Sequence, residues 1–114
     1  MNRDDHYHIT FVILPYHVYN QNPQLETVMI CVERMVRVSD VKYDAANDRA
    51  IIKTVMQNKE ISLMHEFLAE NGITRSALLY LDNNVLKTVY CNLEGTAFSC
   101  HEIEDYIKER EDLK

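Results

Sequence analysis

Two histidines near the start of the chain have the spacing of a metal-ligand pair. His6 and His8 flank Tyr7 at the beginning of an apolar, β-branched run. In a β-strand the side chains at positions i and i+2 point to the same face, so both imidazoles would lie on one side of the strand. Two imidazoles on one face can share a divalent metal ion. The sequence indicates no third ligand, and the alternative is a pair of ordinary histidines at a strand edge.

The tripeptide His6-Tyr7-His8 resembles the His-hydrophobic-His motif of the HUH nucleases. Members of that family hold a metal at the histidine pair and use a helix-borne tyrosine as nucleophile, on a ferredoxin-like core. The resemblance covers three residues and one tyrosine. It implies a metal-dependent nuclease or phosphodiesterase, with Tyr106 of the last predicted helix as the nucleophile. The apolar spacing of Tyr106 with Ile103 and Ile107 instead favours a core or half-buried aromatic.

Other catalytic and cofactor-binding patterns are missing from the sequence. The chain has only two glycines, so it has no glycine-rich phosphate-binding loop. Its three cysteines, Cys31, Cys91 and Cys100, contain no CxxC pair, and their spacing matches neither a disulfide framework nor a zinc site. We expect unpaired thiols in a reducing, cytoplasmic compartment. We also expect no cofactor and no enzymatic activity.

An acidic segment near the C-terminus is the second candidate site. Its six carboxylates are Glu102, Glu104, Asp105, Glu109, Glu111 and Asp112. With three basic residues, the final fifteen residues have a net charge of −3. Such a run is either the solvated face of an amphipathic helix or a docking surface for a basic partner protein.

Length and charge limit the remaining classes of function. The 114 residues fit one domain over residues 1–114, and 46% of them are hydrophobic, which is enough to bury a core. The net charge is −6, and residues 58–114 hold 11 acidic and 6 basic side chains. This balance disfavours direct binding to nucleic acid or to an anionic membrane and favours a basic protein as partner. No stretch reaches the roughly 20 apolar residues of a membrane-spanning helix.

The apolar patterns predict alternating strands and helices. Residues 6–19 read as a buried strand whose regular part ends at Pro15. Asn22-Pro23 is a typical helix start, followed by an apolar stripe to Val36. The same segment also alternates and is rich in β-branched residues, so a strand within 24–37 is the alternative. Further along we predict hairpins at 38–43 with 50–56 and at 77–81 with 85–93, and helices at 61–71 and after the capping box Ser99–Glu102.

These elements predict an α+β fold with a ferredoxin-like βαββαβ core and a C-terminal strand and helix extension. A strand at 24–37 would make the fold richer in sheet. We interpret the chain as a small acidic protein-binding regulator or inhibitor of the immunity or counter-defence type, acting on a basic nucleic-acid-handling protein. One alternative is the HUH-like nuclease using His6 and His8. Another is a self-associating structural domain that forms a homodimer through residues 28–38.

Overall fold

The computed structural model of the chain describes residues 6–31, 34–37 and 40–110. Within these residues, the chain forms a small α+β fold with a five-stranded antiparallel sheet, three α-helices and a separate two-stranded hairpin. In chain order the elements are β1 (Tyr7–Leu14), α1 (Tyr16–Asn20), β2 (Thr27–Cys31), β3 (Arg34–Arg37), β4 (Asp40–Asp44), β5 (Arg49–Gln57), α2 (Asn58–Glu70), β6 (Ser76–Asp82), β7 (Val85–Asn92) and α3 (Cys100–Arg110).

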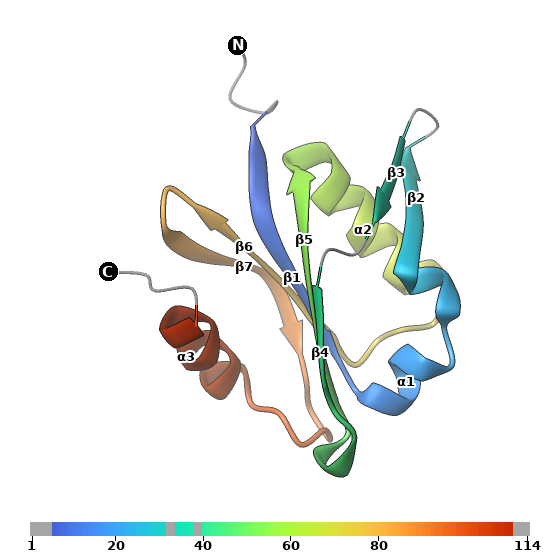
Figure 1. The fold of residues 1–114 in the computed structure, drawn as a ribbon, viewed down its shortest axis with the longest axis vertical. Helices are drawn as coiled ribbons and strands as arrows, with labels where there is room; N and C mark the ends of the chain where they lie inside the picture. Colours follow the sequence, from blue (N-terminus) through green and yellow to red (C-terminus); the bar gives the residue numbers. More distant parts are fainter. Residues whose placement is uncertain (1–5, 32–33, 38–39, 111–114) are drawn as a thin grey trace.

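Strand β1 lies at the centre of the sheet. The strand order is β4-β5-β1-β6-β7, and each neighbouring pair is antiparallel. Because β5 and β6 both run antiparallel to β1, they are parallel to each other, and α2 forms the crossover between them. Figure 1 shows α2 and α3 on opposite sides of this sheet, with α1 and the β2–β3 hairpin on the α2 side.

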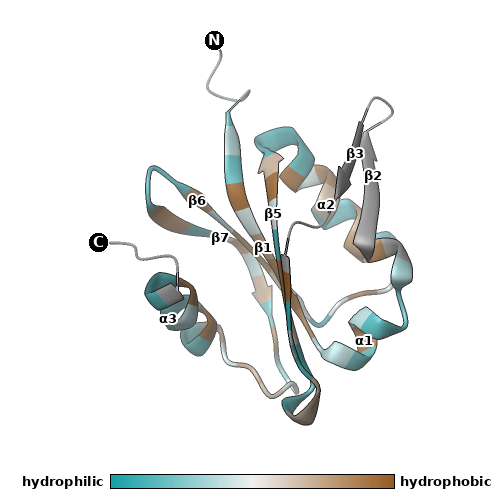
Figure 2. Ribbon diagram, viewed as in Figure 1, coloured by the Kyte–Doolittle hydropathy of each residue, from teal (hydrophilic) through white to brown (hydrophobic). Residues whose placement is uncertain are grey.

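The central strands contribute alternate side chains to two cores, one on each face of the sheet. Val12 and Leu14 are buried in the cluster on the α2 side. Phe11 and Ile13 are buried in the cluster on the α3 side. This two-sided burial explains why β1 is a continuous apolar run instead of an alternating one. The hydropathy colours follow it, since brown residues concentrate on the inner strands and on the sheet-facing side of α3 (Figure 2).

The helix predicted after Asn22-Pro23 is wrong, and the strand alternative is correct. Residues Pro23–Glu26 form one 3-10 turn, after which β2 and β3 pair as an antiparallel hairpin. The Asn-Pro signal therefore starts only a short turn, and the β-branched residues that follow adopt extended backbone. A ferredoxin-like core needs a crossover helix between its first two strands. In this chain the short helix α1 and the β2–β3 hairpin take the place of that crossover helix. The ferredoxin-like arrangement is thus not confirmed.

The remaining predicted elements agree with the structure to within a few residues, except that the strand predicted over residues 6–19 ends at Leu14 and α1 takes the place of its last part. Both predicted hairpins form, as β4–β5 and β6–β7. Asn83 and Asn84, at the β6–β7 turn, have φ of 53° and 63°, as a type I′ turn requires. Helices α2 and α3 occupy the expected segments, whereas α1 was not predicted. Among the described residues, no helix is long and apolar enough to cross a membrane.

Candidate functional site

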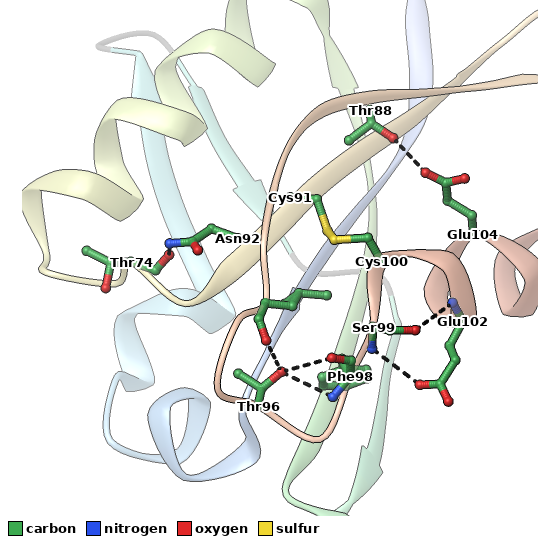
Figure 3. The surroundings of a disulfide bond; sticks show 11 residues. Thr74, Thr88, Cys91, Asn92, Thr96, Phe98, Ser99, Cys100, Glu102 and Glu104 are labelled. Atoms are coloured by element: carbon green, nitrogen blue, oxygen red, sulfur yellow. Dashed lines mark hydrogen bonds between the residues drawn. A yellow bond between two sulfur atoms is a disulfide. The ribbon is translucent and has the colours of Figure 1, made fainter.

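Helix α3 begins at the capping box that its sequence predicts. The Ser99 Oγ accepts a hydrogen bond from the Glu102 backbone N–H at 3.1 Å, and the Glu102 Oε2 accepts one from the Ser99 N–H at 3.3 Å (Figure 3). These bonds satisfy two of the amides that a helix N-terminus leaves without intrahelical partners. The cap therefore defines where α3 starts and gives Glu102 a structural role.

A disulfide between Cys91 and Cys100 ties the start of α3 to strand β7 (Figure 3). The two Cα atoms are 6.3 Å apart, inside the range that a disulfide spans. The expectation of unpaired thiols is wrong for these two cysteines. Because disulfides persist mainly in oxidising environments, the cysteines no longer support a reducing compartment. The side chain of Cys31 in β2 lies outside the described part of the structure.

The loop between the two cysteines is held by two buried apolar residues and one hydroxyl group. Leu93 and Phe98 are buried in the core cluster on the α3 side. The Thr96 Oγ1 donates to the Leu93 carbonyl at 2.6 Å and accepts from the Phe98 N–H at 3.1 Å. The loop therefore turns back on itself and brings Cys100 to Cys91. Sequence reasoning missed this pairing because a separation of nine residues matches no motif.

Three of the predicted acidic residues form a stripe along the outward side of α3. Glu102, Asp105 and Glu109 are exposed, and their spacing of three and four residues places them on one side of the helix. Ile103 and Ile107 are buried on the other side, at 3% and 1% exposure. We call Glu102, Asp105 and Glu109 the acidic stripe. Asp105 also lies 3.2 Å from His101, an ion pair when the imidazole is protonated.

The other three predicted carboxylates do not belong to this stripe. Glu104 is half-buried and faces β7, where its carboxylate accepts from the Thr88 hydroxyl at 3.5 Å (Figure 3). Glu111 and Asp112 lie outside the described residues. The predicted acidic surface therefore reduces to three described positions. Glu102 takes part in the helix cap, whereas Asp105 and Glu109 do not.

A cavity of about 390 Å³ lies beside α3, between the helix and strands β4 and β5. Its apolar wall contains Ile51, Phe98 and Ile103. Two cations lie over aromatic rings there: the Lys42 Nζ is 6.0 Å from the Tyr106 ring centroid, and the Arg49 guanidinium is 5.0 Å from that of Phe98. We call this space the α3 cavity. The predicted nucleophile Tyr106 thus lines an amphipathic cavity.

His6 and His8 line a different cavity, of about 380 Å³, beside the β6–β7 turn. His8 is only 8% exposed, and its Nδ1 lies 3.1 Å from the Leu81 carbonyl oxygen. Because a carbonyl only accepts, Nδ1 must donate, which leaves Nε2 unprotonated in the neutral ring. Within the described residues, the buried Nε2 has no hydrogen-bond partner. His6 is exposed and precedes the first residue of β1.

The fold does not bring together the residues of the HUH-like hypothesis. The ring of His8 packs against Tyr80, which contacts the core cluster on the α2 side. Tyr106 packs against the cluster on the opposite face. Among the described residues, no group of three or more His, Cys, Asp or Glu side chains is placed to hold a metal ion. The histidine pair and the tyrosine therefore cannot act on one substrate atom in this arrangement.

The segment proposed for self-association forms most of the β2–β3 hairpin. Residues 28–31 and 34–37 are strand residues of this hairpin, which contacts α2 but does not join the main sheet. The side chains of residues 28–38 lie outside what the structure describes. The homodimer therefore stays a prediction.

Comparisons with protein-family models, with curated proteins and with solved structures give no match to this chain. The features of the chain that bear on its function are therefore the acidic stripe, the two cavities and the residues that form them.

Proposed function

We propose that this chain is a small protein-binding regulator or inhibitor that docks a basic partner protein on the acidic stripe of α3. The observation that supports the proposal is the exposure of Glu102, Asp105 and Glu109 together on one side of a helix whose start is anchored twice. A helix held by a cap and a disulfide loses little conformational freedom on binding. Aligned carboxylates raise the rate of association with a cationic surface.

The charge of the stripe also suggests the class of partner. A basic protein that handles nucleic acid carries the cationic surface that would complement these carboxylates. Occupying that surface with an acidic helix would compete with phosphate binding. We therefore propose inhibition of such a protein, in the manner of immunity or counter-defence proteins, as the specific form of this function.

The test separates the charge of the stripe from the charge of the whole molecule. In the variant Asp105→Lys/Glu109→Lys the cap residue Glu102 and the Thr88 contact of Glu104 remain. The matched control Glu66→Lys/Glu70→Lys makes the same change in net charge on the exposed side of α2. We expect tagged wild type and the α2 control to retain the same basic protein from a lysate of the native host, and the α3 variant to lose it.

The salt dependence of the captured interaction provides the second readout. With the purified partner, the association rate constant of wild type should fall as ionic strength rises, and that of the α3 variant should be lower and depend less on salt. Equal retention by both variants, or no retained protein with wild type, would leave the acidic stripe as an ordinary solvated helix face.

A further inference from the structure

We propose that the α3 cavity is a binding site for a small organic carboxylate with an aromatic or branched aliphatic body. This inference does not require protein docking on the acidic stripe, although Glu102 belongs to the stripe and also lines the cavity. The cavity, about 390 Å³, falls in the size range of small-molecule sites, and such sites combine an apolar wall with a few placed polar groups. Phe98 and Ile103 supply buried apolar surface, at 6% and 3% exposure.

Among the described residues, neither positive charge of this cavity forms a close ion pair, although the side-chain hydrogen bond from Asn47 and the charge of Arg49 help to lower the pKa of Asp44 in the same lining. Lys42 contacts the ring of Tyr106, and Arg49 contacts the ring of Phe98 and donates from Nη2 to the Ala97 carbonyl at 2.9 Å. Within the described residues, neither cation lies within ion-pair distance of a carboxylate. The Arg49 Nε is buried without a hydrogen-bond partner among those residues. The unpartnered Nε of Arg49 and the nearby charge of Lys42 favour an anionic ligand group.

The two carboxylates at the cavity already have local hydrogen-bond donors. Asp44 accepts from the Asn47 backbone N–H at 3.2 Å and from the Asn47 Nδ2 at 2.7 Å. Glu102 accepts from the Ser99 N–H in the helix cap. Their hydrogen-bonding capacity is partly used. Arg49 also uses one donor, on the Ala97 carbonyl, but its buried Nε has no partner among the described residues. The cavity is therefore complementary to a carboxylate with an apolar body.

A pair of isosteric probes tests the charge requirement without changing the protein. We would titrate the oxidised full chain with 3-phenylpropionate and with 3-phenylpropanamide, following backbone amide resonances by NMR. We expect saturable shifts for Ile51, Phe98, Ile103 and Tyr106 with the carboxylate, with a dissociation constant in the millimolar range that suits a ligand of this size. The neutral amide should bind about tenfold more weakly.

Variants then locate the cation. Arg49→Gln should reduce the affinity for 3-phenylpropionate by about tenfold, to that of the amide. Arg75→Gln removes an exposed cation that does not line the cavity, and it should bind as wild type does. Lys42→Gln, an exposed position, is the second variant if Arg49→Gln does not fold. Absence of saturable shifts at the cavity residues, or equal affinity for the two probes, would overturn the proposal.

Discussion

At the scale of single residues, Glu60 is the polar residue of α2 whose side chain is buried. Glu60 is 1% exposed, and its Oε1 accepts from the Gln57 backbone N–H at 2.8 Å in a capping box. Glu60→Ala leaves that amide without its acceptor and should lower the free energy of unfolding by about 1–2 kcal/mol. Glu60→Gln keeps a side-chain acceptor and should cost less. Urea unfolding measures both variants, and equal costs would contradict the capping role.

Asp48 makes stability depend on pH. Its carboxylate accepts from the His17 backbone N–H at 2.8 Å and lies 2.7 Å from the His17 Nδ1. The bond from the backbone N–H is the main cause that lowers the pKa of Asp48 below its ordinary value of 3.8. A lowered carboxyl pKa contributes stability above the unfolded-state pKa, and this contribution is lost as the pH falls through the folded-state pKa.

Comparison with Asp48→Asn isolates this effect. Asn also tolerates the left-handed backbone of this position, where φ is 54°. We expect wild type to be more stable than Asp48→Asn at about pH 6 and the gap to shrink at about pH 2, because the contribution of the carboxylate is lost as the pH falls through its lowered folded-state pKa. Urea unfolding at the two pH values measures the difference in free energy of unfolding between the two proteins. If this difference does not change with pH, the hydrogen-bond geometry of Asp48 and not its charge stabilises the fold.

Local residue signals were predictable from the sequence, and signals that depend on tertiary contact were not. The Ser99–Glu102 box and the Asn83-Asn84 turn depend only on residues close in the chain, so the local sequence is enough to predict them. The partnership of Cys91 with Cys100 depends on how Leu93 and Phe98 anchor the loop between them. The half-burial of Glu104 likewise depends on the position of β7, which the helical spacing alone does not give.

At the scale of elements, the disulfide should contribute to stability through the unfolded state. It closes a loop with a sequence separation of nine residues, for which loop-closure entropy gives about 2–3 kcal/mol. Reduction of wild type by a dithiol, or the variant Cys91→Ser/Cys100→Ser, should lower the free energy of unfolding by this amount. Urea unfolding with and without the dithiol measures it. The double variant serves as control, because the dithiol should not affect it.

The β2–β3 hairpin marks the limit of sequence prediction for elements. Apolar residues from Leu25 to Val36 fit both a helical stripe and a strand alternation. Periodicity does not decide between the two, and the Asn22-Pro23 signal favoured the helix that the structure replaces with a 3-10 turn. For β1 the continuous β-branched run fits only a strand, and the strand was predicted correctly up to Leu14 but not in the segment that forms α1. The error therefore came from a segment in which cap chemistry and side-chain propensity disagree.

At the scale of the whole molecule, one sheet separates two cores, and neighbouring residues of β6 are buried in different cores. Leu78 is fully buried on the α2 side, and Leu79, at 1% exposure, is buried on the α3 side. Each Leu→Ala change removes buried methyl groups and should cost about 2–5 kcal/mol. Because both cores share the same strands, we expect either change to destabilise one cooperative unit. Urea unfolding should then give a lower midpoint with an unchanged m-value for both variants.

Hydrogen exchange shows whether α2 and α3 unfold together as one cooperative unit. If the fold is cooperative, Leu79→Ala should lower the protection of the most protected amides of α2 and of α3 by the same factor, although Leu79 belongs only to the cluster on the α3 side. Leu78→Ala should do the same from the opposite face. If Leu79→Ala instead exposes α3 alone while α2 keeps its protection, α3 is a separable layer held on the sheet by its disulfide. The acidic stripe and the α3 cavity would then both be positioned by local contacts and not by the global fold.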